Sequence, residues 1–448
     1  MLITTDTNRV IIGLGKTGIS CARYFSAMGL DFSIADSREN PPSLEEFSTQ
    51  YPEVRVSVGP FSDNEFDAAS QLIVSPGVSL KEPAIARALE LGIEVVGDIE
   101  LFCRAINKPV VAITGSNAKS TVTTLVGEML QACGLKVAVG GNIGTPVLDL
   151  VNADVDIFVL ELSSFQLETV KSIGAEVATV LNVSEDHMDR YEGIADYHRA
   201  KHRIFHGCRS VVVNRDDALS SPLVGESVRV CSFGLGVPDL DQFGLVRENA
   251  QEWLAQGSTP LIPVSGLRVQ GRHNQANALA ALAIIHSLRL ELKPALAVLL
   301  EFKGLPHRCQ WVAEVNGVVF INDSKATNVG AAVAAIDGIG QQLKGKVVLI
   351  AGGDGKDADF SGLRPIVDKY VKSSLLIGRD AARIESSLYG LASARCGDLR
   401  EAVVKACTIA EPGDVVLLAP ACASFDMFTG FEDRGDQFVR WVQEVAHV

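Results

Sequence analysis

The chain has 448 residues, enough for about three domains of average size, and 47% of them are hydrophobic. Its formal net charge of −14 argues against a nucleic-acid partner, because phosphate backbones are bound by excess Lys and Arg. No apolar run is long enough to span a bilayer, and the opening MLITTDTN lacks the basic and apolar regions of a signal peptide. Nine scattered cysteines without a CxxC pair predict reduced thiols in a cytoplasmic protein.

Short runs rich in Val and Ile alternate with helical patterns along almost the whole chain. They predict strands over residues 9–12, 71–75, 110–114, 156–162, 177–183, 211–214, 318–323, 346–352 and 414–420. Strands separated by helices favour parallel sheets that are covered on both faces. Breaks near 97 and 304 divide the chain into three predicted α/β domains, residues 1–97, 98–304 and 305–448, the first and last Rossmann-like and the central one P-loop ATPase-like. Residues 216–272 have the least regular pattern, which indicates short strands and loops.

The first glycine loop, RVIIGLGKTGIS, carries G-x-G-x-x-G at Gly13, Gly15 and Gly18 directly after a strand, and Asp36 ends the next strand. This is the dinucleotide fingerprint in its usual context, so an NAD-dependent oxidoreductase is one interpretation. The physical requirement is broader, because glycines and a helix N-terminus favour the diphosphate of any nucleotide. A purely structural tight turn is the weaker alternative.

The second glycine loop lies in VVAITGSNAKSTVTT, residues 110–124. Lys119 is placed to reach the outer phosphates of ATP, Ser120 or Thr121 to bind Mg²⁺, and successive N–H groups to bind anionic oxygens. Ala118 stands where this pattern has glycine, which costs about 1 kcal/mol if the residue needs a positive φ. Apolar residues then recur at helical spacing up to Gly134, a predicted C-cap.

Two neighbouring strand ends supply metal-type ligands. Glu161 ends a buried strand, and Asp186, His187 and Asp189 follow another. The carboxyl ends of parallel strands line the ligand crevice, so these groups are expected to converge on the phosphate loop. Glu161 and His187, together with a serine of that loop, therefore predict a Mg²⁺ site on a bound nucleotide.

Three histidines follow at helical spacing. His198, His202 and His206 occupy positions i, i+4 and i+8, so they are expected to share one helical face. No acidic or cysteine ligand completes a zinc set, and a solvated face is the preferred interpretation.

Three further loops follow strands in the last third of the chain. They contain Asp323 and Lys325, then Lys356, then Ser424 and Phe431. Three polar loops at strand ends of one domain predict a site for an anionic small molecule.

Taken together, these motifs resemble the Mur ligase family of peptidoglycan synthesis, and within it the D-glutamate-adding member. The matching stretches cover nearly the whole chain: GLGKTGIS, SPGV, TGSNAKST, GGNIGTP, ELSSFQLE, NVSEDHMDRY, GRHNQANALAA, GLPHR, NDSKATN, GGDGKDADF and ACASFDMFTGFEDRG. The resemblance implies an ATP-dependent ligase that adds D-glutamate to UDP-N-acetylmuramoyl-L-alanine through an acyl phosphate. An oxidoreductase using the Gly13–Gly18 loop, another Mur or folylpolyglutamate-type ligase, and a nucleotide-sugar-binding protein with a degraded ATP loop remain alternatives.

The resemblance also implies roles for individual residues. Catalytic roles fall to Lys119, His187, Lys201 and Arg308, and contacts to ATP fall to Gly115, Ser116, Asn117, Ala118, Lys119, Ser120, Thr121, Asn274, Arg308 and Asp323. Two Mg²⁺ sites would use Ser120, Glu161, His187 and a carbamate on Lys201. The UDP substrate would contact Gly15, Lys16, Thr17, Asp36, Ser37, Arg38, Ser75, Pro76 and Gly77, with Asn142 and Ser163 beside it, and D-glutamate would contact Thr327, Lys356, Ser424 and Phe431. A monomer whose domains close around the substrates is expected.

Overall fold

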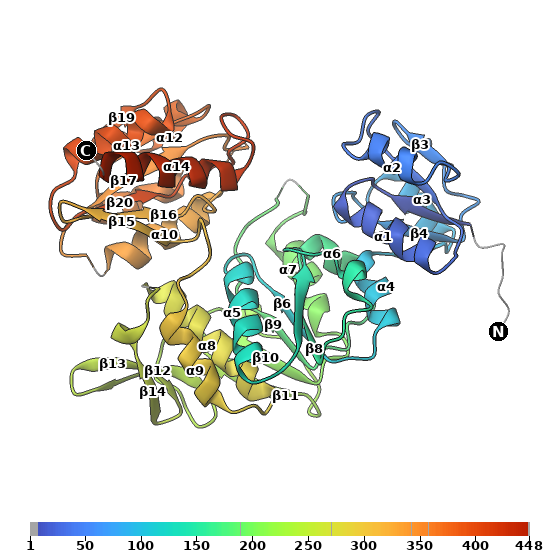
Figure 1. The fold of residues 1–448 in the computed structure, drawn as a ribbon, viewed down its shortest axis with the longest axis horizontal. Coiled ribbons are helices and arrows are strands. Elements are labelled where there is room, and N and C mark those ends of the chain that lie inside the picture. Colours follow the sequence, from blue (N-terminus) through green and yellow to red (C-terminus); the bar gives the residue numbers. More distant parts are fainter. Residues whose placement is uncertain (1–7, 189, 270, 342, 357, 447–448) are drawn as a thin grey trace. The chain divides into compact units, whose positions relative to one another are not determined.

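The computed structural model describes residues 8–188, 190–269, 271–341, 343–356 and 358–446. The chain divides into two compact units, one formed by residues up to 246 with 255–259 and 279–298, the other by 247–254, 260–278 and the residues from 299 onward. The strands of the described residues form three mostly parallel sheets with helices packed on them, so the predicted α/β class is confirmed (Figure 1).

The first sheet is parallel throughout. It consists of β1 (Arg9–Ile12), β2 (Ser33–Asp36), β3 (Val56–Val58), β4 (Gln71–Val74) and β5 (Glu94–Val96), in the order β3-β2-β1-β4-β5. Its helices are α1 (Lys16–Ala27), α2 (Leu44–Gln50), α3 (Pro83–Glu90) and α4 (Asp98–Ala105). Alternate strand residues point to opposite faces, so Ile11 joins the core that contains Phe25 of α1, whereas Val10 and Ile12 join the core that contains Ile85 of α3.

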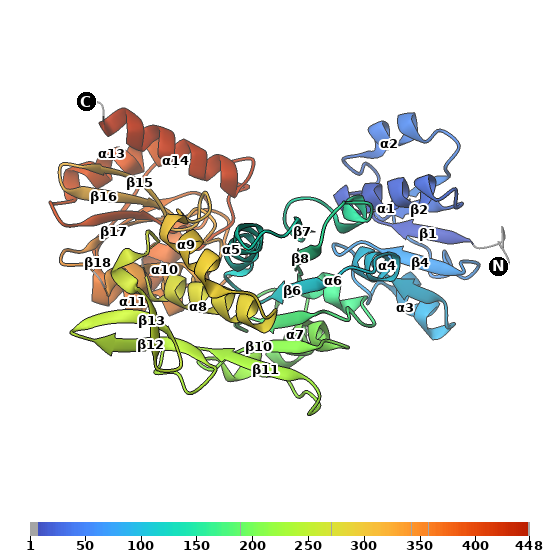
Figure 2. The same cartoon turned by 60° about the horizontal axis from the view of Figure 1, so that its bottom comes forward.

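The second sheet has the order β14-β13-β12-β11-β10-β9-β6-β8-β7. Its strands are β6 (Val110–Thr114), β7 (Val137–Gly141), β8 (Ile157–Glu161), β9 (Val177–Val180), β10 (Ser210–Asn214), β11 (Arg229–Phe233), β12 (Phe243–Glu248), β13 (Gln251–Gln256) and β14 (Thr259–Pro263). The α-helices that follow in this part of the chain are α5 (Lys119–Ala132), α6 (Ser164–Glu168), α7 (Ile194–His202), α8 (Arg272–Ser287) and α9 (Leu292–Glu301). Figure 2 shows β10 and β11 running side by side, as their parallel register requires.

The third sheet has the order β15-β16-β20-β17-β18-β19, in which only β15 pairs antiparallel among the described strands. Its strands are β15 (Gln310–Val315), β16 (Val318–Asn322), β17 (Val347–Gly352), β18 (Val371–Ile377), β19 (Ser393–Arg395) and β20 (Val415–Leu418). The helices are α10 (Val329–Gly340), α11 (Arg364–Tyr370), α12 (Ala381–Ser387), α13 (Leu399–Ile409) and α14 (Phe431–Ala446). Leu349 faces the core of α10 to α12, and its neighbour Ile350 faces that of α13 and α14, which lie side by side (Figure 1).

All nine strands expected from apolar runs are present within about three residues of the expected bounds. The helix after Lys119 is also confirmed: its apolar residues are buried, and Gly134 follows its end with φ +88°. None of the helices in the described ranges combines the length and apolarity needed to cross a membrane.

The expected arrangement of the three histidines is wrong. Helix α7 ends at His202, and a 3₁₀ turn over Arg203–Phe205 carries His206 away from the helical face. His198 and His202 stack with ring centroids 3.7 Å apart, and burial lowers the pKa of His202 below its usual value. The pair is therefore partly packed and not simply a solvated face.

Candidate functional site

The phosphate-type loop connects β6 to α5, and Ala118 is the residue at which the helix begins. Ala118 has φ +67° and ψ −5°, the left-handed conformation that glycine adopts at little cost. The loop therefore keeps the backbone that the glycine pattern specifies, although the residue carries a methyl group. The N–H groups of the first helical turn have no acceptor inside the helix itself, which suits them to phosphate oxygens.

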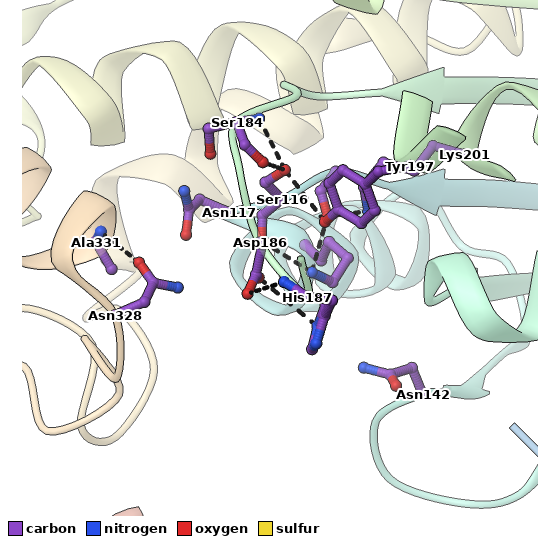
Figure 3. A network of polar contacts seen from close by, with 12 residues as sticks. Ser116, Asn117, Asn142, Ser184, Asp186, His187, Tyr197, Lys201, Asn328 and Ala331 are labelled. Atoms are coloured by element: carbon purple, nitrogen blue, oxygen red, sulfur yellow. Dashed lines mark hydrogen bonds and ion pairs between the residues drawn. The ribbon is translucent and has the colours of Figure 1, made fainter. Parts of the chain in front are cut away.

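The first part of this loop is held by the segment after β9. The N–H of Ser116 donates to the Asn182 carbonyl at 2.9 Å, and the N–H of Asn117 donates to the Asn182 side chain at 2.8 Å. The Ser116 hydroxyl lies 2.9 Å from the Ser184 carbonyl and 3.2 Å from the Tyr197 hydroxyl (Figure 3). Asn182 and Tyr197 were not predicted from the sequence, because they are 65 and 81 residues away from the groups they hold.

Two lysines converge on one carbonyl oxygen of the loop. Lys119 Nζ donates to the oxygen of Gly115 at 2.8 Å, and Lys201 Nζ donates to the same oxygen at 2.9 Å. Lys201 is only 1% exposed and lies over the Tyr197 ring at 4.4 Å. Burial, with the charge of Lys119 as a second cause, lowers the pKa of Lys201 well below its usual range. Lys201 therefore loses its proton more easily than an exposed lysine does.

Glu161 ends β8 beside the loop, because the strand register pairs it with Ile113 of β6. Its side chain is 1% exposed, and its Oε1 accepts a 2.6 Å hydrogen bond from the Asn142 amide. Its Oε2 is buried without a hydrogen-bond partner among the described residues. A buried carboxylate oxygen without a donor is costly unless a cation binds it, so this oxygen fits a metal ligand.

The segment after β9 brings His187 and Asp186 to the same end of the sheet. His187 has φ +58°, and its N–H donates to Asp186 Oδ1 at 3.0 Å (Figure 3). Its ring packs edge-on against Phe165, with ring centroids 4.7 Å apart. Asp186 and Glu161 both act electrostatically on Lys201, so their carboxylates lie within electrostatic range of its amine. Asp189 lies outside the described residues.

No group of three or more His, Cys, Asp or Glu side chains in the described ranges is arranged to hold a metal on its own. The predicted set instead combines Ser120, Glu161, His187 and Lys201, of which Ser120 lies 7% exposed in the first turn of α5. Ser163 caps α6 through a reciprocal pair with Gln166.

The residues predicted for the UDP substrate lie in the loops after β1, β2 and β4, which are neighbours in the first sheet. Gly15 begins α1, with Lys16 and Thr17 in the first turn. Ser75 donates to the carbonyl of Gly13 at 3.2 Å and so joins two of these loops. Strand order reverses between β1 and β4, and such a switch point is where open α/β sheets bind ligands.

Asp36 is 2% exposed, and both of its carboxylate oxygens are engaged. They accept from the N–H of Leu14 at 2.7 Å and from the Arg38 guanidinium at 2.7 and 2.8 Å. Although burial opposes ionisation, the bonds from Arg38 and Leu14 hold the pKa of Asp36 below its usual value. Asp36 thus holds the loop after β1 against Arg38.

Arg190, which was also not predicted, joins the first sheet to the second. Its guanidinium donates to the carbonyls of Pro76 and Val78, each at 3.0 Å, and pairs with Glu168 at 3.0 Å. It also lies 4.3 Å from the centre of the Phe165 ring. The loop containing the predicted substrate residues 75–77 is thus held by the segment that carries His187.

The predicted ATP contacts Asn274, Arg308 and Asp323 belong to the second unit. Asn274 is 8% exposed in the first turn of α8, where its side chain accepts from Asn277 at 3.2 Å. Asp323 directly follows β16, and its Oδ1 accepts from the N–H of Cys309 at 3.1 Å. Burial raises the pKa of Asp323 to about 6. Arg308 is half-buried, next to Cys309.

The residues predicted for D-glutamate lie in the loops after β16, β17 and β20 and at the start of α14, and these segments are joined. Asp354 and Ala423 exchange backbone hydrogen bonds of 3.0 and 2.8 Å, which link the loop of Lys356 to that of Ser424. Lys325, close to Thr327, places its amine 3.7 Å from the centre of the Phe431 ring. Lys356 is exposed with φ +48°, and Ser424 is buried.

Comparisons with known proteins agree along the chain. Family models match residues 7–97 (Mur ligase MurD-like, N-terminal domain), 113–285 (Mur ligase middle domain) and 307–422 (Mur ligase, glutamate ligase domain). UDP-N-acetylmuramoylalanine–D-glutamate ligases of Pseudomonas fluorescens and Pseudomonas aeruginosa are each 54% identical to this chain, covering 99% of it and 100% of the relative.

Two solved structures have the same fold at lower identity. A pseudomurein peptide ligase type C from Methanothermus fervidus gives a TM-score of 0.60 at 19% identity, covering 98% of this chain and 100% of its own. The UDP-N-acetylmuramate-alanine ligase MurC from Thermotoga maritima gives 0.58 at 19% identity, covering 98% of this chain and 99% of its own. At this identity the similarity concerns the fold alone.

Proposed function

The chain belongs to the Mur ligase family, and from this premise we propose that it joins D-glutamate to UDP-N-acetylmuramoyl-L-alanine with hydrolysis of ATP to ADP and phosphate. Relatives that carry the name of this ligase are 54% identical over essentially their full length, which supports the same substrates here. The observation that carries the proposal is the convergence of Lys119, Lys201 and Glu161 beside one phosphate-type loop, where Glu161 Oε2 has no hydrogen-bond partner among the described residues. An oxidoreductase built on the Gly13–Gly18 loop has no comparable support.

Mg²⁺ fits the residues around this loop. Glu161 Oε2, the hydroxyl of Ser120 and the imidazole of His187 would hold it, and the ion would supply positive charge for the phosphates of ATP. A second ion would be held through Lys201. Burial makes Lys201 easier to deprotonate, and its neutral amine can add carbon dioxide and lose a proton, which gives a carbamate whose single negative charge is shared by two oxygens. Labelled bicarbonate should then give a carbamate ¹³C signal that Lys201→Arg lacks.

Amide synthesis requires a better acyl donor than a carboxylate. Lys119 would release the carbonyl of Gly115 and neutralise the charge of the transferring γ-phosphoryl group, which would pass to the L-alanyl carboxylate. The amine of D-glutamate would attack the resulting acyl phosphate, lose a proton and expel phosphate. Asn142 would keep Glu161 oriented through its 2.6 Å hydrogen bond.

The other substrates are assigned by the loops at strand ends. The UDP end would contact Gly15 to Thr17, Asp36 to Arg38 and Ser75 to Gly77, and Ser163 would line the path toward ATP. D-glutamate would contact Thr327, Lys356, Ser424 and Phe431, whose loops are joined to one another by hydrogen bonds and ring contacts.

Domain boundaries near 97 and 304 are proposed from the same assignments. Nucleotide-linked substrates and ATP support a cytoplasmic location, and a monomer is proposed.

The decisive experiment measures phosphate release from ATP with UDP-N-acetylmuramoyl-L-alanine and D-glutamate, L-glutamate or no amino acid. Release that needs both the UDP substrate and D-glutamate is expected. If no condition releases phosphate while the UDP substrate still binds, the ligase assignment is wrong and a nucleotide-sugar-binding protein remains. Release that needs another amino acid would point to a different member of the family.

A further inference from the structure

The guanidinium of Arg434 is completely buried in the last unit of the chain. The residue is 0% exposed, on the second turn of α14, and burial lowers its pKa to about 10, so it remains a cation at neutral pH. No carboxylate in the described ranges forms an ion pair with it, and Asp426 acts on it only through space. A buried charge without an opposite partner is costly, so its presence requires a reason beyond packing.

Every described partner of Arg434 is an oxygen in a loop at the carboxyl end of the sheet. Its Nε donates to the Ser324 hydroxyl at 2.9 Å, and one Nη donates to the carbonyls of Ser324 at 2.8 Å and Cys422 at 3.1 Å. The other Nη approaches the carbonyls of Gly352 at 3.5 Å and Ala423 at 3.4 Å. One side chain thus holds the loops after β16, β17 and β20.

The same contacts reach the start of α14. The hydroxyl of Ser324 accepts from Arg434 and donates to the carbonyl of Phe431 at 2.8 Å. Gly353 packs so closely against this network that a side chain would not fit. A Cβ on residue 353 would lie 2.2 Å from the Ala423 carbonyl oxygen and 3.3 Å from the Arg434 guanidinium. The four residues proposed to contact the amino acid all lie on these segments. Arg434 binds the three loops directly and reaches the start of α14 through Ser324.

The contacts also fix the direction of the peptides. In a trans peptide the carbonyl and the following N–H point in opposite directions. Carbonyls of Gly352 and Ala423 that face Arg434 therefore turn the N–H groups of Gly353 and Ser424 away from it. Both residues are buried. The carbonyl ends of these two peptides therefore face the cation and their N–H ends face away from it.

We propose that Arg434 is a positioning residue for the acidic amino-acid substrate: it holds the three loops and supplies a buried positive charge next to them, which favours a dicarboxylate over a neutral amino acid. This inference rests on the proposed ligase function. Arg434 does not touch the substrate, so its effect should appear in the Michaelis constant (KM) for the amino acid and much less in that for ATP or the UDP substrate.

The test compares steady-state kinetics and thermal unfolding of the full chain for Arg434→Met, Arg434→Lys and Ser324→Ala. Arg434→Met should raise KM for D-glutamate at least tenfold, with KM for ATP changed less than twofold. Arg434→Lys should recover part of the loss, because it keeps the charge but not the planar fork. Ser324→Ala removes one acceptor and should raise KM for D-glutamate about threefold.

Phe438→Leu is the matched control, because Phe438 is fully buried one turn further along α14 and packs only in the helix-sheet core. It should lower the melting temperature while leaving KM for D-glutamate unchanged. An unchanged KM in folded Arg434→Met, or an equal rise in Phe438→Leu, would overturn the inference. If Arg434→Met does not fold, an unchanged KM in Ser324→Ala overturns it. If the wild-type protein does not turn over, the proposed ligase function is itself wrong. That outcome differs from one in which the wild type is active and only the inference about Arg434 fails.

Discussion

At the scale of single residues, three of the loops assigned to substrates each contain a residue other than glycine with a positive φ. Ala118, His187 and Lys356 have φ of +67°, +58° and +48°, a region that residues with a Cβ seldom enter. Such conformations persist only where the surroundings enforce them, and they occur often at functional sites. Here the Asn182 side chain accepts from the N–H of Asn117, next to Ala118, and Asp186 accepts from the N–H of His187.

Ala118→Gly should relieve the strain of the phosphate-type loop. We expect the left-handed strain of about 1 kcal/mol to be removed, partly offset by the larger entropy of glycine in the unfolded chain. ATP affinity, measured by calorimetry, should be unchanged or modestly tighter. Ala250→Gly is the control, since Ala250 has φ +64° in an exposed turn that carries no proposed role. A large loss of ATP affinity in Ala118→Gly alone would show that the loop is built around the methyl group.

Glu161→Gln should separate stability from activity. The amide keeps an acceptor for Asn142 and removes the buried charge, so the melting temperature should stay the same or rise. Phosphate release should fall by about 100-fold or more, because a ligand of Mg²⁺ is lost. Calorimetric titration with Mg²⁺ and an ATP analogue provides a second readout. Unimpaired turnover would exclude Glu161 as a metal ligand.

At the scale of elements, the central strands of the sheets could be predicted from their apolar composition, whereas the short edge strands could not. Every expected strand is an apolar run in a sheet, but β3, β5 and β19 have three residues each and are half-exposed, too short to show a period. The hairpin strands β12 and β13 mix polar and apolar residues and depend on their turn at Asn249 and Ala250.

The candidate site was predictable where function lies in one stretch of sequence and not where it depends on distant partners. The Lys119 loop and the strand-terminal Glu161 are local patterns. Asn182, Tyr197 and Arg190 contribute through contacts that only folding creates. Arg434 did carry a local signal: it stands four residues before Phe438 and eight before Val442, on the face of α14 that is otherwise apolar.

Helix α13 offers a test of an element far from the proposed chemistry. Asp398 caps it by accepting from the N–H of Glu401 at 2.8 Å. Asp398→Ala should destabilise the last unit by about 1 kcal/mol, visible as a lower melting temperature, with KM values unchanged. Asp398→Ser, which retains a capping oxygen, should recover most of the loss; equal losses in both variants would contradict capping as the cause.

At the scale of the whole molecule, the residues assigned to ATP come from both sides of residue 304. We therefore expect a conformational change when ATP and the UDP substrate are both present, because substrate-driven closure protects an acyl phosphate from water. Small-angle scattering should show a smaller radius of gyration with a non-hydrolysable ATP analogue and the UDP substrate than with either alone. No compaction with both bound would contradict closure.

The buried position of Arg434 also limits how the protein could be re-engineered. Changing only the side chains proposed to touch the amino acid would leave the buried cation and the peptides that it orients. A library restricted to that outer layer should therefore keep returning variants that accept acids, however much their size preference shifts. Acceptance of a neutral amino acid would require a compensated exchange of Arg434 together with Ser324, which makes the choice of substrate charge harder to evolve than the choice of substrate shape.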